Sequence, residues 1–144
     1  MIYSWSTDLN STVYKDSLSI RNKVFVDEQN VPSEMEVDEY EALTTYVIGY
    51  LDSIPVVTAR LLPMDQQTYK VQRVAVLKNY RGKQIGKKTM IEIERFAIEN
   101  NRTSLILGAQ DHAIEFYSSL GYLINSEGYL DAGIPHHDMI KQLG

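Results

Sequence analysis

A basic turn with two glycines, at residues 81–88, is the stretch of this chain best suited to bind an anion. An apolar run precedes the turn and apolar residues at helical spacing follow it, so it is predicted to join a strand to a helix. The first N–H groups of a helix have no partner within the helix, and they attract phosphate. Gly82 and Gly86 let a bulky anion approach the backbone. An ordinary loop with solvated lysines is the alternative, while Walker and dinucleotide glycine patterns are both absent.

Two residues further along the chain are able to exchange a proton at neutral pH. Tyr117 carries a phenol, whose usual pKa of about 10 keeps it protonated at pH 7, so it can serve as an acid. His136 directly follows Pro135, and an imidazole titrates near neutrality and can accept a proton directly or through water. A tyrosine that only packs a helix and a histidine with a structural role are the alternatives.

Three charged residues are candidates for recognising a second ligand. Arg21 and Arg73 are suited to a carboxylate or phosphate, because a guanidinium binds either through a planar fork. Their alternatives are an arginine whose stem lies along the edge of a helix and an arginine paired with acids of a nearby loop. Glu28, or else Glu34, is a candidate for attracting an amine, whereas the acidic run at residues 34–41 is predicted to be a solvated face.

The elements that must position these residues follow a β-α-β-β-β-α-β-α-β order, in which the last β stands for two strands. This order predicts an α+β fold, or an α/β fold of three layers, with one mixed sheet in a single domain over residues 1–144. Ser11 or Asn10 is expected to cap the first helix, Asp111 the last one, and Gly121 to follow its end. Strands are predicted near residues 1–6, 44–50, 55–62, 69–77, 104–107, 122–125 and 137–143, and helices near 13–25, 85–100 and 112–120.

The composition excludes several classes of function. With 44% hydrophobic and 23% charged residues, the 144-residue chain is an ordinary globular protein large enough for a core. It has no cysteine, which excludes disulfides, thiolate metal sites and an acyl-cysteine intermediate, and no metal site is expected. The net charge of −5 argues against a nucleic-acid partner. No export signal or membrane-length apolar run is present, so a cytoplasmic protein without a membrane partner is expected.

Four stretches together resemble one protein family. Residues 81–86 (R-G-K-Q-I-G) after a V-A-V strand resemble the acyl-CoA pyrophosphate loop of the GNAT superfamily of N-acetyltransferases, with Gln84 in place of a glycine. Residues 113–122 (A-I-E-F-Y-S-S-L-G-Y) resemble the superfamily motif A-x-x-F-Y-x-x-L-G-F/Y. Residues 20–38 and 129–139 (Y-L-D-A-G-I-P-H-H-D-M) are similar to signatures of the ElaA-type and YjcF-type branch, with Asp131 in place of glutamate. The resemblance covers nearly the whole chain.

The resemblance implies a mostly antiparallel sheet of six to seven strands, flanked by helices, whose fourth and fifth strands splay apart to admit acetyl-CoA. It implies that Tyr117 protonates the departing thiolate, and that His136 is the base or an acceptor-binding group. Arg21, Arg73 and Glu28 are then expected at the acceptor. The residues expected to bind acetyl-CoA are Val74, Ala75, Val76, Arg81, Gly82, Lys83, Gln84, Ile85, Gly86 and Lys87.

The sequence therefore predicts an N-acetyltransferase that moves an acetyl group from acetyl-CoA to a primary amine of a small molecule, by direct transfer in a ternary complex. A module that senses acyl-CoA without turnover is the first alternative, and a nucleotide-phosphate binder is a third possibility. A monomer or a homodimer is expected.

Overall fold

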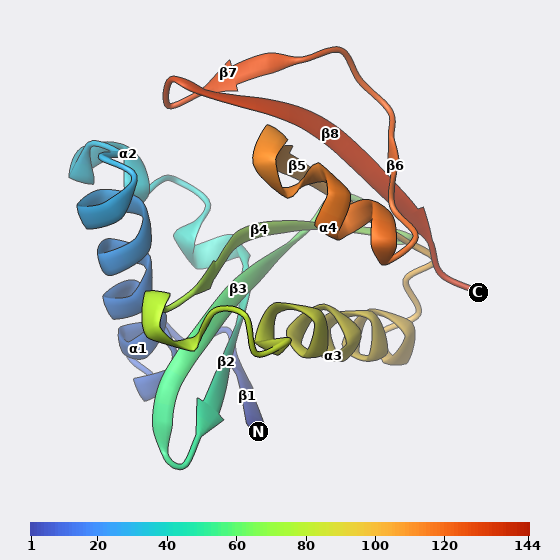
Figure 1. The fold of residues 1–144 in the computed structure, drawn as a ribbon. Helices are drawn as coiled ribbons and strands as arrows, with labels where there is room; N and C mark the ends of the chain where they lie inside the picture. The colour runs from blue at the N-terminus through green and yellow to red at the C-terminus, as the bar shows by residue number, and fades with distance from the viewer.

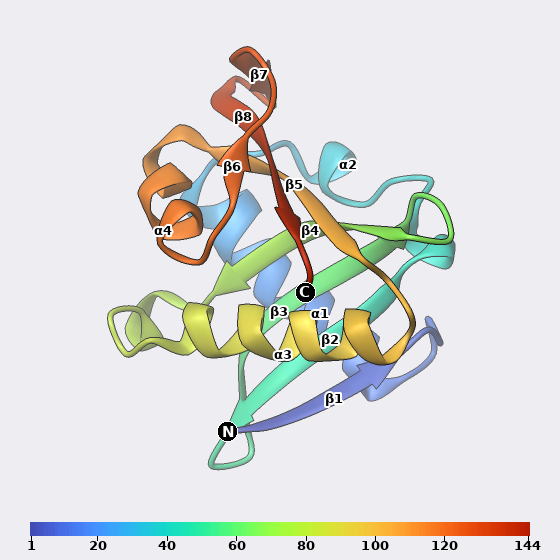
Figure 2. The same ribbon diagram turned by 90° about the vertical axis from the view of Figure 1, so that its right-hand side faces the viewer.

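One eight-stranded sheet forms the centre of the computed structural model, which describes all 144 residues. Seven strands lie in the order β1-β2-β3-β4-β5-β8-β6, and β7 pairs with the other end of β8. Figures 1 and 2 show α1 on one face of the sheet and α3 on the other, which gives three layers. The strands are β1 (Ile2–Ser6), β2 (Thr45–Leu51), β3 (Ile54–Pro63), β4 (Thr68–Val76), β5 (Ser104–Gln110), β6 (Leu123–Ile124), β7 (Tyr129–Asp131) and β8 (Ile134–Gln142).

Four α-helices and four short helical turns connect these strands. Ser11 caps α1 by accepting a hydrogen bond from the Tyr14 N–H at 3.1 Å, as predicted. The stripe of α3 that includes Met90 and Ile93 is buried against the sheet. The helices are α1 (Thr12–Arg21), α2 (Ser33–Glu36), α3 (Ile85–Glu99) and α4 (Ile114–Ser119), with a π-helical turn η1 (Asn22–Glu28) and 3₁₀ turns η2 (Glu41–Leu43), η3 (Lys78–Tyr80) and η4 (Asp111–Ala113). No helix is both long and apolar enough to cross a membrane.

The sheet opens between β4 and β5, its only parallel pair. These strands pair over only four residues, Thr68–Val71 with Ser104–Leu107. Immediately beyond, β4 carries a bulge opposite β3, and Arg73 within it has a φ of 54°. A bulge adds an unpaired residue and bends its strand, so the rest of β4 turns away from β5 (Figure 2). The predicted splaying of the fourth and fifth strands is confirmed.

The α+β class and the mostly antiparallel sheet are confirmed, but the end of the chain differs from prediction. The last strand begins at Ile134 rather than near 137, and β7 folds back on it, which gives eight strands. Ala132 and Gly133 form the turn of this hairpin with φ values of 51° and 76°. Alanine is a poor indicator of such a turn, and Pro135 argues against a strand in sequence, so the hairpin was missed.

The predicted boundaries of two helices also change. The first helix was expected to reach about residue 25, but regular α-helix ends at Arg21 and the π-helical η1 continues to Glu28. Asp111 does not cap α4, because its carboxylate pairs with His137 at 2.7 Å. The left-handed residue predicted after α4 is confirmed, with a φ of 98° at Gly121.

Candidate functional site

A cavity of about 800 Å³ lies where β4 and β5 separate. Its walls come from the segment between η1 and α2, the bulged half of β4, the end of β5, α4, the turn before α3 and the β7–β8 hairpin. Most of the predicted site residues therefore meet around one cavity. Those that line it are Arg73, Val74, Ala75, Val76, Arg81, Gly82, Gln84, Ile85, Gly86, Lys87, Tyr117 and His136. Arg21, Glu28 and Lys83 are not in its lining.

The turn before α3 presents a row of free donors at one end of this cavity. Lys88 is the first residue after Arg81 whose N–H has a backbone acceptor, and it donates to the Gln84 carbonyl at 3.0 Å. The backbone N–H groups of residues 82–87 donate no hydrogen bond within the protein. Gln84 has a φ of 61°, so it keeps the left-handed conformation that glycine usually supplies at this position. These donors, with Arg81 and Lys87 beside them, suit a pyrophosphate.

Two residues at the end of η1 join the two sides of the cavity. Arg81 forms a two-pronged pair with the Glu28 carboxylate, with both N–O distances 2.9 Å, and its Nε donates to the Val76 carbonyl at 3.0 Å. Glu28 thus pairs with the turn and does not line the cavity. The next residue, Gln29, accepts from Nε2 of Gln110 at 2.9 Å, and Gln110 lies at the end of β5.

Tyr117 projects from α4 into the aromatic cluster beside the cavity. Its ring meets Phe116 and Tyr122 edge-on, with centroid distances of 5.0 and 5.7 Å. Burial raises the pKa of Tyr117 to about 12, so the phenol carries its proton at neutral pH. Tyr117 therefore meets the requirement for a proton donor in both location and protonation state.

His136 lies across the cavity on β8, and only 8% of it is exposed. Its Nδ1 is 2.7 Å from the Ile134 carbonyl oxygen, so this nitrogen carries the hydrogen and donates it. Nε2 of the neutral ring then holds the lone pair and is the atom able to accept a proton. The Tyr129 ring stacks on the imidazole with a centroid distance of 5.7 Å.

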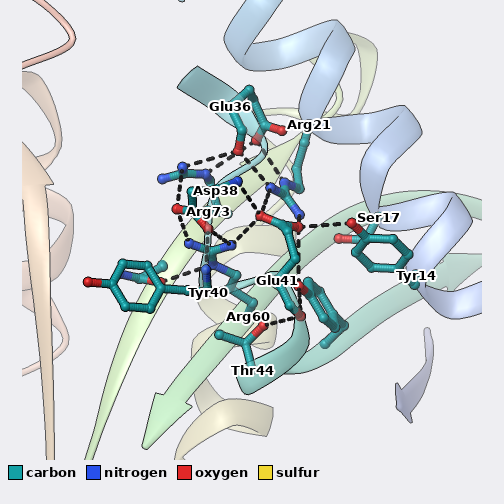
Figure 3. Close-up of polar contacts among 12 residues, drawn as sticks. Tyr14, Ser17, Arg21, Glu36, Asp38, Tyr40, Glu41, Thr44, Arg60 and Arg73 are labelled. Carbon is teal, nitrogen blue, oxygen red and sulfur yellow. Dashed lines mark hydrogen bonds and ion pairs between the residues drawn. The ribbon is translucent and has the colours of Figure 1, made fainter. Parts of the chain in front are cut away.

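Arg21 lies in a buried network of charges instead of the cavity (Figure 3). Its Nε donates to Glu36 at 2.7 Å and its Nη1 to Glu41 at 2.8 Å, while Nη2 donates to the Glu36 carbonyl and to Glu41. The guanidinium is 0% exposed and all its nitrogens have acceptors. The structure therefore does not bring Arg21 to an acceptor, because no donor of it faces the cavity.

The same network corrects the prediction for the acidic run. Glu36 and Glu41 are buried whereas Glu34 and Glu39 are exposed, so the prediction of a solvated face holds for only part of the run. Arg60, which the sequence analysis did not single out, donates to Glu41 at 2.7 Å and to Asp38 at 2.8 Å. Three arginines (21, 60 and 73) thus balance three acids (36, 38 and 41). An arginine in the middle of the apolar strand 55–62 was the available signal that buried acids exist elsewhere.

Arg73 stands at the edge of this network and also lines the cavity. Its Nη2 lies 3.2 Å from both Asp38 Oδ2 and the Glu36 carbonyl oxygen, and 24% of the side chain is exposed. Burial and the nearby Arg60 charge lower the pKa of Arg73. Arg73 is thus the only arginine of the network that is partly exposed, and its contacts with the acids are longer than those of Arg21, so it is the one placed to bind a further anion.

The sequence matches the family described as "Acetyltransferase (GNAT) domain" over residues 13–143. The chain belongs to the GNAT acetyltransferase family. The N-acetyltransferase YjcF of Bacillus subtilis is 39% identical over 92% of this chain and 94% of its own length. The ElaA structure from Escherichia coli has 26% identity and a TM-score of 0.87 over 98% of this chain and 99% of its own. An acyl-CoA N-acyltransferase from Pseudomonas aeruginosa has 26% identity and a TM-score of 0.86, over 97% and 98%.

These comparisons confirm the predicted branch of the GNAT family, whose members are N-acetyltransferases that use acetyl-CoA. The free N–H groups at residues 82–87 and the end of β4–β5 pairing at Val71 fit such a co-substrate. The N–H groups would hold its phosphates, and the end of the pairing leaves backbone groups of β4 available to its pantetheine arm.

The network predicts a large loss of stability when one arginine is removed. Arg21→Met leaves Glu36 and Glu41 buried with too little positive charge, so the free energy of unfolding should fall by about 3–5 kcal/mol. Urea denaturation at pH 7 measures this change. Arg95→Met is the matched control, because Arg95 pairs with Glu92 and Glu99 on an exposed helix face, and it should leave the midpoint nearly unchanged.

The contribution of the network to the free energy of unfolding should also depend on pH. Burial alone raises the pKa of Glu41, but hydrogen bonds and charge from Arg21 outweigh it and hold the pKa far below its usual range. Such a group stabilises the fold above its unfolded pKa of about 4.3, and that contribution is lost as pH falls toward the folded value. Glu41→Gln should lose this acid dependence. An unchanged slope between pH 5 and pH 3 would contradict the assignment.

Proposed function

We propose that this enzyme transfers an acetyl group from acetyl-CoA directly to a primary amine of a small molecule, with both bound in one ternary complex. The observation that supports this most strongly is that one cavity connects the free N–H groups of the turn with Tyr117 and His136. The chain has no cysteine that would carry the acetyl group between the two substrates. Acetyl-CoA supplies an activated thioester, and the remaining requirements fall on the protein.

The protein must first bind the co-substrate along β4 and the turn. Residues 82–87 offer their N–H groups to the pyrophosphate, with Lys83 and Lys87 adding charge. Val74, Ala75 and Val76 lie beyond the last pairing of β4 with β5, so their edge of the strand is available to the pantetheine amides, except where Arg81 already donates to the Val76 carbonyl. An N–H on this edge is also suited to polarise the thioester carbonyl.

Two proton transfers remain. An ammonium with a pKa of about 10.4 must lose its proton, which costs about 4–5 kcal/mol at pH 7. Nε2 of His136 accepts that proton, because Nδ1 is committed to the Ile134 carbonyl. Tyr117 donates its proton to the departing thiolate, since it is protonated and lines the same cavity. Arg73, the partly exposed arginine of the network that lines the cavity, binds an anionic group of the acceptor.

The loop assignment predicts the effect of one substitution. Gly86→Asp places a carboxylate where the phosphates bind, so the affinity for acetyl-CoA should fall sharply. Gly86→Ala is the matched control, because an added methyl would lie 3.4 Å from the Phe116 ring and carries no charge. Titration calorimetry should give a much larger Kd for the aspartate variant than for the alanine variant. Equal affinities in two folded variants would reject this loop as the pyrophosphate site.

The role of Tyr117 can be separated from its packing. Tyr117→Phe keeps the ring and removes the donor, so kcat should fall by roughly 10²–10⁴-fold with little change in acetyl-CoA affinity. Tyr122→Phe is the control, since the Tyr122 hydroxyl is buried in the same aromatic cluster, has no hydrogen-bond partner and is not in the cavity lining. It should retain full turnover. Wild-type turnover in Tyr117→Phe would show that the Tyr117 hydroxyl is not the proton donor and that the residue only packs its helix.

The function itself is tested by incubating the protein with acetyl-CoA and a panel of small amines, with release of free thiol as the readout. The panel should contain amines that carry a carboxylate, each beside its matched amide. We expect the carboxylates to have the lower KM, and Arg73→Lys to remove that preference, because lysine lacks the planar fork. Equal KM values would exclude Arg73 as the anchor. Tight acetyl-CoA binding without turnover on any amine would favour the alternative that the protein senses acyl-CoA and is not a catalyst.

A further inference from the structure

The β7–β8 hairpin places one tyrosine directly on the backbone of β5. The Tyr129 hydroxyl donates to Asp138 Oδ1 at 2.6 Å. Asp138 pairs with Gly108 across β8 and β5, so the hydroxyl lies above this residue pair. A methyl group added to Gly108 would lie only 2.5 Å from the Tyr129 hydroxyl oxygen, but 3.8 Å from the ring carbon that bears it. Glycine at 108 is thus what leaves room for this hydroxyl.

The same tyrosine covers one face of the His136 ring. The two rings are 19° from parallel, and Tyr129 and His136 are partners in the β7–β8 pairing. The Ile134 carbonyl fixes Nδ1, and 8% of His136 remains exposed. One hydrogen bond is a modest restraint on rotation of the ring about its Cβ–Cγ bond, and such a rotation would break the contact of Nδ1 with the Ile134 carbonyl. The stacked Tyr129 ring opposes this rotation, because it is itself held at its far end by Asp138.

We propose that Tyr129 is a positioning residue for His136, anchored by Asp138 and admitted by Gly108, and that it keeps Nε2 of His136 directed into the cavity. This inference rests on the proposed role of His136 as the base. Burial and the neighbouring Asp138 raise the pKa of Tyr129, so its phenol stays protonated and continues to donate. The anchor is therefore a hydrogen bond from a neutral phenol to a carboxylate, which is stronger than one between two neutral groups.

Two single variants and their combination test this. Gly108→Ala should displace the tyrosine ring and lower kcat on the order of 10- to 100-fold, with the KM for acetyl-CoA nearly unchanged. Tyr129→Phe loses the anchor but keeps the stack, and should lower kcat only several-fold. The double variant should be more active than Gly108→Ala alone, because the phenylalanine no longer meets the added methyl. If Gly108→Ala lowers kcat equally in the wild type and in Tyr129→Phe, the proposal is overturned.

A second readout does not depend on turnover. Ring ¹⁵N chemical shifts of His136 report which nitrogen carries the hydrogen in the neutral ring. The wild type should show the Nδ1–H tautomer, and Gly108→Ala a mixture that returns toward wild type in the double variant. Unchanged shifts in Gly108→Ala would overturn the positioning role. If no amine is acetylated by the wild type, the proposed function fails while these shifts still decide the role of Tyr129.

The proposal stays testable if Gly108→Ala does not fold. Tyr129→Phe and Asp138→Ala remove the two ends of one hydrogen bond without adding atoms. Both should then shift the His136 tautomer to a similar extent, with His136→Ala setting the lower limit for activity. A shift in one variant but not in the other would show that this hydrogen bond does not hold the ring.

Discussion

Three arginines and three carboxylates neutralise one another between α1 and the sheet, and the wall of the cavity depends on them. Arg21 comes from α1, Arg60 from β3 and Arg73 from β4, whereas all three acids come from one short segment. That segment contains only α2 and η2, so it lacks a long element with its own packing. Charges are costly to bury, but breaking such a set is costlier, and this favours one docking position for residues 36–41.

The network also connects two features that would otherwise be independent. Arg73 lies in the β4 bulge, in a left-handed conformation that a residue with a side chain adopts at some cost. Its guanidinium contacts Glu36 and Asp38, so the acids hold the bulged residue in place. The bulge separates β4 from β5 and creates the cavity. The position of the acidic segment and the opening of the sheet thus stabilise each other.

Local patterns in the sequence predicted the parts of the site that depend on local structure. The strand, turn and helix around Gly82 were found because periodicity and glycine carry the information within one window. The burial of Arg21 was not found, because its partners lie 15 and 20 residues away and become neighbours only when η1 and α2 fold back. The pairing of Glu28 was missed for the same reason, since Arg81 is 53 residues distant. The roles of Tyr117 and His136 remain predictions.

The Gln29–Gln110 contact has a topological consequence. Bonds run in a closed circuit from Val71 along β4 to Arg81, through Glu28 and Gln29 to Gln110, and back along β5 to Leu107. A ligand with its two ends on opposite faces of the sheet would pass through the opening that this closed path surrounds. Such a ligand could not leave sideways, between the two walls, until one of the two side-chain contacts in the path broke. These contacts are an exposed ion pair and a pair of amides, and each contributes little to stability, so either one can break and re-form readily.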